Sequence, residues 1–349
     1  MQLQLTTEQH KRAEAVHASA LVTDMAWATN PAWPTPLIDG RYALERAAAG
    51  GVSAANVTVV AYGASFRDAI KEINSLRRLI ADRSDVALLV QTTADLDQAK
   101  QEGKIGIIVG FQTGSPLEDD WANTLPVLQL LGLRVMQLTY NEHNLIGSGC
   151  LEPDDRGLTA YGNQVINALN EQGVIIDLAH VGMRTAADAV ERSAQPVIVS
   201  HANARALFPH PRNLPDDLMR LVAEHGGVIG TTAWDVLCRR DSKERPDLGA
   251  CLDNIAYVAD LVGVDHVGIG TDNNENFRAL PMRSDFAVQY LQDDDTSTPL
   301  GLDGFSWMDE FVNLTRGLVQ RGFSDEDCAK ILGGNFRRVA DSVWHKEAQ

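Results

Sequence analysis

Two neighbouring stretches, "GVIIDLAHVG" at residues 173–182 and "QPVIVSHANA" at residues 195–204, decide how this chain is expected to fold. Each is a short run of apolar residues, rich in valine and isoleucine, that leads into a histidine: His180 in the first and His201 in the second. Such runs are typical of strands that are buried on both faces of a parallel sheet. Parallel strands of a barrel present their carboxyl ends at one face, so we expect the two histidines to lie close together.

The same alternation of apolar strand and amphipathic helix recurs along the chain. Segments with the periodicity of an amphipathic helix separate most of the strands, for example residues 66–83, 159–173 and 253–263. Eight such units predict an α/β fold, specifically a (β/α)8 TIM barrel. A doubly wound parallel sheet is the runner-up, but no GxGxxG motif follows the first strand. The eight expected strands are residues 19–24, 55–62, 104–111, 134–140, 173–180, 196–201, 226–234 and 265–272.

No linker rich in Pro, Gly or Ser divides the chain, so we expect one domain over residues 1–349. The barrel should occupy about residues 19–300, after an N-terminal helix at about residues 7–17. C-terminal helices should follow within about residues 305–345. One of them is expected to begin after Ser324, because Asp327 stands three residues later, as in a capping box.

Composition narrows the classes of partner. The formal net charge is −17 and no run of Lys or Arg is present, which argues against nucleic acid and anionic membranes as partners. The four cysteines form no CxxC pair and are expected to be reduced thiols. No run of 18 apolar residues predicts a membrane span, and the polar N-terminus does not resemble a signal peptide. We therefore expect a cytoplasmic protein that acts on a small molecule.

The residues at the carboxyl ends of the expected strands are the candidates for a functional site. His180 and His201 are the strongest pair, because neutral imidazole is a common ligand of zinc and iron. Asp272 ends the last strand, "DHVGIGTD", where its carboxylate could ligate a metal, transfer a proton or simply cap the next turn. Arg212, in "HPRNLPDD", could bind a carboxylate of the substrate or form a surface salt bridge.

The stretches "IDLAHV", "PVIVSHANA", "PRNLPDDLMRLV", "DHVGIGTD" and "ILGGNFRRV" occur in this order and together resemble the membrane (renal-type) dipeptidase family. That family belongs to the metal-dependent amidohydrolase superfamily, and the resemblance runs over about residues 19–342. It implies a barrel with a two-zinc site that hydrolyses dipeptides, and a homodimer. It also implies that His180 and His201 bind metal, that Arg212 binds the substrate carboxylate and that Asp272 handles proton transfer.

This chain departs from the family pattern at several ligand positions. The first-strand His-x-Asp falls on Ala26 and Ala28, with only the preceding aspartate retained as Asp24. The bridging glutamate falls on Gln112 and the fourth-strand histidine on Tyr140. Alanine cannot ligate a metal, and glutamine is a weak neutral donor that rarely bridges two cations. The candidates for completing the metal shell are Tyr140 and Asp272, followed by the weaker candidates Asp24, Gln112 and His143.

Three functions remain open from the sequence. The first is hydrolysis of a dipeptide or a related small amide by a metal-activated water, with His180, His201 and Asp272 as catalytic residues and with Arg212, Tyr140 and Gln112 binding the substrate. The second is a repurposed metalloenzyme, such as a non-haem iron oxygenase that acts on a small apolar molecule. The third is a non-catalytic, ligand-binding barrel. For the first two, the expected cofactor is one or two ions of zinc or iron.

Overall fold

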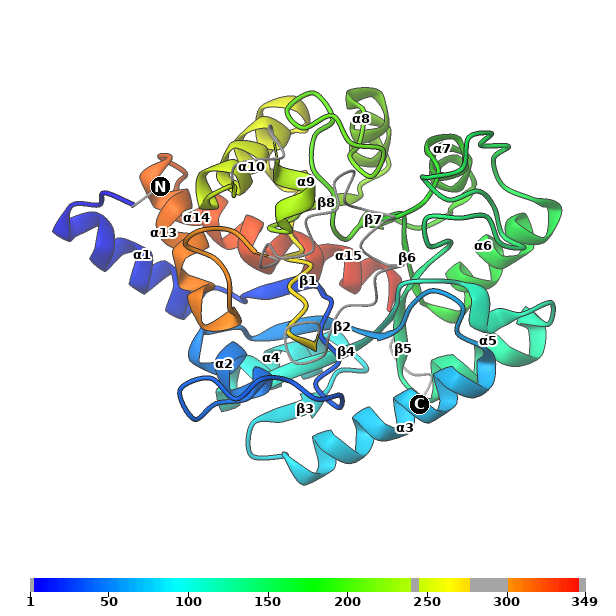
Figure 1. The fold of residues 1–349 in the computed structure, drawn as a ribbon, viewed down its shortest axis with the longest axis horizontal. Helices are drawn as coiled ribbons and strands as arrows, with labels where there is room; N and C mark the ends of the chain where they lie inside the picture. The colour runs from blue at the N-terminus through cyan, green and yellow to red at the C-terminus, as the bar shows by residue number, and fades with distance from the viewer. Residues whose placement is uncertain (1–2, 240–244, 277–300, 345–349) are drawn as a thin grey trace.

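The computed structural model describes residues 3–239, 245–276 and 301–344. Within these residues, nine parallel strands form one sheet that curves into a barrel (Figure 1). Eight of them follow one another around the barrel in the order β1-β2-β4-β5-β6-β7-β8-β9, which confirms the expected α/β barrel. The strands are β1 (Thr23–Trp27), β2 (Ala54–Val60), β3 (Ala87–Leu89), β4 (Ile105–Phe111), β5 (Leu133–Gln137), β6 (Ile175–Asp177), β7 (Ile198–Val199), β8 (Val228–Thr231) and β9 (Val267–Ile269).

The first and last strands approach each other at their carboxyl ends. Asp272, just after β9, donates its backbone N–H to the carbonyl of Ala26 in β1 over 2.8 Å. The side chain of Asp24 accepts a further hydrogen bond of 2.9 Å from the backbone N–H of Thr271. These bonds nearly close the barrel at the end where the active sites of such folds lie.

The strand β3 was not expected from the sequence. It pairs with the first half of β4, with Ala87 opposite Ile105, whereas β5 pairs with the second half of β4, with Met136 opposite Phe111. Because β2 occupies one edge of β4, both β3 and β5 pair with the other edge, each along a different half of β4. The strand β3 therefore adds no ninth position to the barrel.

The observed strands are shorter than the expected ones or, like β1, displaced along the chain, and this shifts the candidate residues relative to them. Asp24 lies inside β1 rather than at its end, while His180 and His201 lie just beyond β6 and β7. His180 has φ of 63° and Asp272 has φ of 54°, so both adopt the left-handed backbone conformation that non-glycine residues rarely take. Such backbone conformations concentrate at functional sites.

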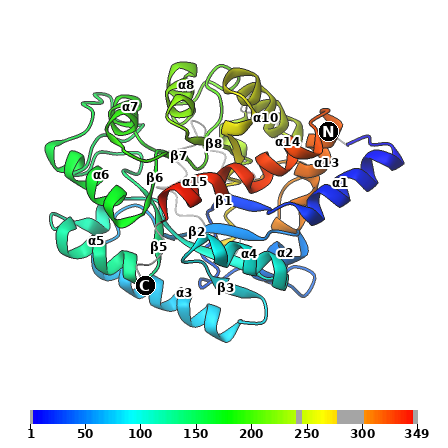
Figure 2. The same cartoon turned by 180° about the vertical axis from the view of Figure 1, so that it is seen from behind.

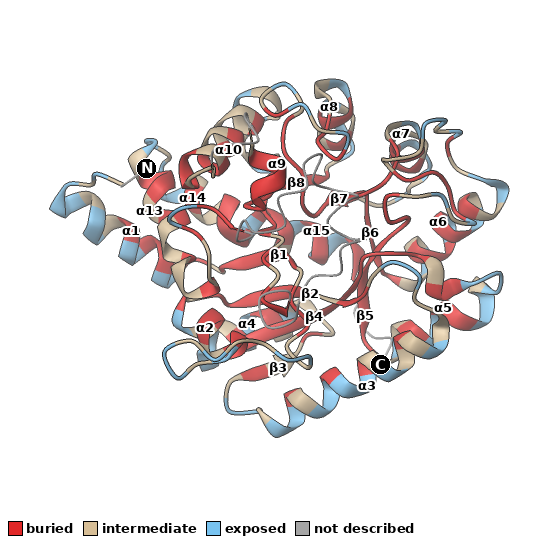
Figure 3. Cartoon of the chain, in the orientation of Figure 1, coloured by how far each residue is buried: buried red, intermediate tan, exposed pale blue. Residues whose placement is uncertain are grey.

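Helices surround the sheet, with buried inner faces and exposed outer faces (Figure 3). In α3, for example, Ser65 caps the first turn, and Ala69, Ile73, Leu76 and Ile80 form the buried stripe at helical spacing. The expected cap of Ser324 on Asp327 is present. The α-helices of the described residues are α1 (Thr7–Ser19), α2 (Ala43–Ala49), α3 (Phe66–Asp82), α4 (Thr93–Glu102), α5 (Trp121–Leu130), α6 (Ala160–Gln172), α7 (Met183–Arg192), α8 (Asp216–Glu224), α9 (Asp235–Cys238), α10 (Leu248–Val262), α13 (Val312–Gln320), α14 (Asp325–Ala329) and α15 (Asn335–Val343).

The last helix, α15, closes the amino-terminal end of the barrel (Figure 2). Asn335 donates its side-chain amide to the carbonyls of Val264 and Val267 at the start of β9, over 2.7 and 2.8 Å. Trp344 donates its indole N–H to the carbonyl of Arg134 in β5. With this end covered, the site is confined to the opposite, carboxyl end. The apolar cluster that α15 packs against contains one residue from each of seven strands: Met25, Ala54, Ile108, Val135, Ile175, Ile198 and Val228.

Candidate active site

The two histidines that follow β6 and β7 meet at the carboxyl end of the barrel. Nε2 of His180 lies 3.0 Å from Nε2 of His201, and the ring centroids are 5.0 Å apart. Both side chains are almost completely buried. Two imidazole nitrogens at this separation can bind one cation together.

Hydrogen bonds at the other ring nitrogens decide which nitrogen carries the proton. Nδ1 of His180 lies 2.7 Å from Oδ1 of Asn141, which can only accept. Nδ1 of His201 lies 2.7 Å from Oγ of Ser200, whose own hydroxyl donates to Oδ2 of Asp177 over 2.5 Å. The network therefore assigns the proton to Nδ1 in both rings and leaves both Nε2 atoms as lone-pair donors.

Burial keeps the pair neutral. Desolvation is the main cause that lowers the pKa of His180 and of His201 well below 6.5, and the nearby positive charge of Arg212 lowers both further. Neutral imidazole is the form that ligates a metal.

Asp177 positions His201 through two successive contacts. It accepts hydrogen bonds from the backbone N–H of Ala179 at 3.0 Å and of Ser200 at 2.8 Å, in addition to the Ser200 hydroxyl. Burial raises its pKa to about 6. Sequence reasoning missed both Asp177 and Ser200, because they lie inside the expected strands 173–180 and 196–201 rather than at their last residues.

Asp24 forms the same arrangement on the opposite side of the barrel. It accepts from the backbone N–H of Ala26 at 3.1 Å and of Thr271 at 2.9 Å, and from the Thr271 hydroxyl at 2.6 Å. Thr271 precedes Asp272 as Ser200 precedes His201. The signal in the sequence is the recurrence of Asp-x-Ala in "TDMAW" and "IDLAH", paired with a hydroxyl residue before the functional side chain.

Asp272 faces the histidine pair. Its Oδ1 lies 4.0 Å from Nε2 of His201. Burial raises its pKa to about 7, against the positive charge of Arg212, while the charge of Asp24 raises it further and Gln112 lowers it. A carboxyl with a pKa near neutral pH can both accept and donate a proton.

Arg212 is buried against the same centre rather than forming a surface salt bridge. One of its terminal nitrogens donates to the carbonyl of His201 over 3.4 Å, and it has almost no exposed surface. Its Nε has no hydrogen-bond partner among the described residues. A buried guanidinium with an unpaired N–H is suited to binding an anionic group of a ligand.

Comparisons with known proteins identify the family of the chain. The sequence profile of the membrane dipeptidase family, Peptidase family M19, matches residues 16–281. The chain belongs to the membrane dipeptidase family. It is 30% identical to an amidohydrolase from Pseudomonas aeruginosa whose crystal structure superposes with a TM-score of 0.84, covering 96% of this chain and 99% of that one.

Two further relatives are more distant. The probable dipeptidase PvdM from Pseudomonas aeruginosa shares 22% identity and a TM-score of 0.79, covering 97% of this chain and 99% of that one, which supports the fold. Dipeptidase tcpJ from Claviceps purpurea is 29% identical over 282 residues. That alignment covers 80% of this chain but only 61% of the tcpJ protein, so the chain spans less than two thirds of that relative.

The donor set fits one cation better than the two zinc ions that the family resemblance implies. Among the described residues, no group of three or more His, Cys, Asp or Glu is arranged to hold a metal ion. The first-strand positions are Ala26, which is buried in β1, and Ala28. Gln112 lies beside Asp272, and its side chain lowers the pKa of that carboxyl. Among these candidate positions in the described part of the chain, the two histidines bring their donor atoms closest together, and Oδ1 of Asp272 lies 4.0 Å from one of them.

Two other candidates for the metal shell, Tyr140 and the weaker candidate His143, occupy different surroundings. The ring of Tyr140 stacks face to face on His180, with centroids 4.1 Å apart and planes 20° apart, and it belongs to an apolar cluster with Trp234. A stacked ring contacts the face of the imidazole rather than the edge that carries Nε2. His143 is exposed and its ring is bonded to Glu152 over 3.0 Å.

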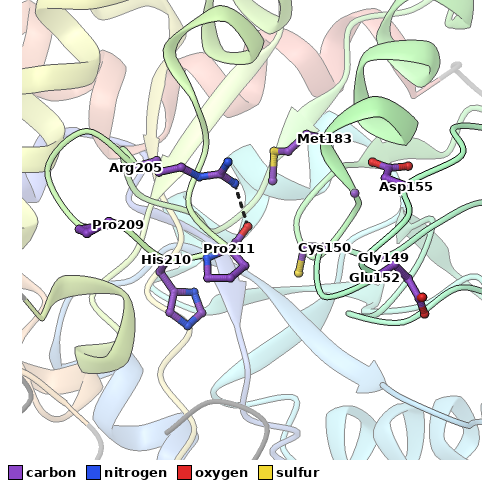
Figure 4. Close-up of a pocket in the computed structure, with 10 residues that line it drawn as sticks. Gly149, Cys150, Glu152, Asp155, Met183, Arg205, Pro209, His210 and Pro211 are labelled. Carbon is purple, nitrogen blue, oxygen red and sulfur yellow. Dashed lines mark hydrogen bonds between the residues drawn. The ribbon is translucent and has the colours of Figure 1, made fainter. Parts of the chain in front are cut away.

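A cavity of about 440 Å³ opens beside this centre, between the loops that follow β5, β6 and β7 (Figure 4). It shares a wall with the site, because the backbone N–H of Cys150 donates to the carbonyl of His180 over 2.9 Å. Most of its charged side chains already have partners: Arg205 donates to the carbonyl of Pro211 over 3.0 Å, and Asp155 accepts from the backbone of α7. The cavity offers space next to the site and few uncommitted polar groups.

Proposed function

We propose that this protein is a metal-dependent hydrolase that cleaves a dipeptide or a related small amide. The observation that carries the proposal is the convergence of His180, His201, Asp272 and Arg212 at the carboxyl end of a membrane dipeptidase barrel. A divalent cation held by the two histidines would polarise the scissile carbonyl and acidify the attacking water. Imidazole nitrogens are suitable ligands for both zinc and iron.

The residues of the chain have separate tasks in this proposal. Arg212 binds the carboxylate of the substrate through its unpaired Nε and so orients the scissile bond. Asp272 accepts a proton at Oδ1 and returns it to the leaving amine, a task that its pKa of about 7 permits. Tyr140, which stacks on His180, and Gln112, which lies beside Asp272, are positioned to contact the substrate.

Family membership favours hydrolysis over the two other functions that the sequence left open, an iron oxygenase and a non-catalytic barrel. The described residues contain no helix that is long and apolar enough to cross a membrane. The cytoplasmic location and the homodimer stay predictions from the sequence.

The test is a hydrolysis assay on protein reconstituted separately with zinc, cobalt, manganese and iron, using a panel of dipeptides and mass-spectrometric detection of the released amino acids. We expect turnover that requires metal, that is lost in His201→Ala and that falls in Asp272→Asn. The matched control is His143→Ala, which removes an exposed histidine outside the pair and should keep full activity. Absence of dipeptide cleavage in every metal form would refute the proposal.

A further inference from the structure

The two histidines face each other in an arrangement that two neutral imidazole rings do not favour by themselves. Asn141 and Ser200 fix both ring protons on Nδ1, so the lone pairs of the two Nε2 atoms point at each other across 3.0 Å. With both lone pairs facing, no hydrogen bond can form between the rings. A cation between them would turn this repulsion into two bonds, so the hydrogen bonds of the chain prepare the pair for one ion.

The surroundings supply few donors beyond the two histidines. Catalytic metal sites usually have three protein ligands and one open position. Here Oδ1 of Asp272, which lies 4.0 Å from Nε2 of His201, could supply at most one further ligand, Gln112 is neutral, and Ala26 and Ala28 carry no donor atom. On the side of β1, neither Ala26 nor Ala28 could hold a second ion.

We infer that this chain binds a single cation through His180 and His201, and that the ligand bound in the site completes the coordination shell. The inference rests on the proposed function for the nature of that ligand: a small peptide or amide contributes carbonyl, amine or carboxylate groups that two histidines leave room for. Metal binding and ligand binding then strengthen each other by the same factor, because coupling between two sites is reciprocal. A relative with a complete two-ion shell would hold its metal without this help.

The experiment measures binding of Zn²⁺ to the metal-free protein by equilibrium dialysis, with and without a phosphinate analogue of a dipeptide that cannot be hydrolysed. We expect a ceiling of one ion per chain, and an affinity for Zn²⁺ that rises about tenfold or more when the analogue is present. Calorimetry with the analogue should show the reciprocal gain when Zn²⁺ is added. Two ions per chain, or an affinity unchanged by an analogue that calorimetry shows to be bound, would overturn the inference.

Three variants locate the effect. His201→Ala should lose the ion, while His143→Ala should bind one ion as tightly as the wild type. Gln112→Glu, which is nearly isosteric, should add a charged oxygen ligand and tighten Zn²⁺ binding in the absence of the analogue. Retention of the ion by His201→Ala would contradict the inference, and so would an unchanged affinity in a folded Gln112→Glu protein.

Failure of this inference can be told apart from failure of the proposed function. Dipeptide hydrolysis by a protein with two ions would sustain the function and remove the single-cation centre. One ion held by the histidine pair, together with no cleavage of any dipeptide, would sustain the single-ion centre and remove the function.

Discussion

Replacing Ser200 by alanine tests whether the hydrogen bonds behind the histidines prepare them for metal. The Ser200 hydroxyl stands between two buried groups: it donates to Oδ2 of Asp177 over 2.5 Å and accepts from Nδ1 of His201 over 2.7 Å. In Ser200→Ala the Nδ1 proton of His201 loses its acceptor. The proton is then better placed on Nε2, where it donates to Nε2 of His180 only 3.0 Å away.

The size of both effects follows from these contacts. Asp177 keeps two backbone donors and loses one hydroxyl, so the metal-free protein should lose about 1–3 kcal/mol of unfolding free energy. To bind a cation, His201 must return its proton to Nδ1, where no acceptor remains. That reversal costs a further ~1–3 kcal/mol and should weaken Zn²⁺ binding about 5- to 150-fold.

The measurements are urea unfolding of the metal-free protein and equilibrium dialysis of Zn²⁺. Ser200→Thr keeps the hydroxyl and should restore most of the metal affinity. Ser193→Ala is the matched control, because Ser193 is a half-buried serine whose hydroxyl donates to the carbonyl of Gln195, outside the histidine network. If Ser200→Ala binds Zn²⁺ as tightly as the wild type, the hydrogen bond to Ser200 does not fix the tautomer of His201, and the reasoning fails.

Three further outcomes are expected. Arg212→Lys keeps the charge but loses the planar donor group, so KM for dipeptides should rise about tenfold or more, while KM for an amidated dipeptide should not change. An equal rise in KM for both substrates would refute the role of Arg212. Burial raises the pKa of Asp24 to about 6, so its ionisation destabilises the folded state as pH rises from about 4 to 6. Over that interval the free energy of unfolding of the wild type should fall by about 3 kcal/mol relative to that of Asp24→Asn. Parallel curves of unfolding free energy against pH would contradict this. Glu275→Gln leaves the fully buried guanidinium of Arg46 without its charged partner and should lower the free energy of unfolding in urea by about 3–5 kcal/mol. Arg12→Ala breaks an exposed ion pair and should lower it by less than about 1 kcal/mol. Similar losses in the two variants would contradict this.

Local apolar periodicity was enough to predict the eight barrel strands, because each strand is a buried run whose pattern does not depend on its partners. The strand β3 escaped this reasoning, since it pairs over only three residues and its existence depends on the free first half of β4. The observed strand ends differ from the expected ones for the same reason: a strand ends where its neighbour stops offering hydrogen bonds. Residues 277–300, which the expected barrel included, lie outside the described residues.

The sequence by itself determined that a histidine follows each of two neighbouring strands, and that alanine and glutamine replace the ligands that the family resemblance predicts. Spacing along one chain is enough for both statements. Only the tertiary structure decided that Nε2 of His180 faces Nε2 of His201, that Ser200 and Asp177 hold one ring in its tautomer, and that Arg212 is buried beside them. These contacts join different strands and loops, so their geometry depends on the register and curvature of the barrel, which no local pattern specifies.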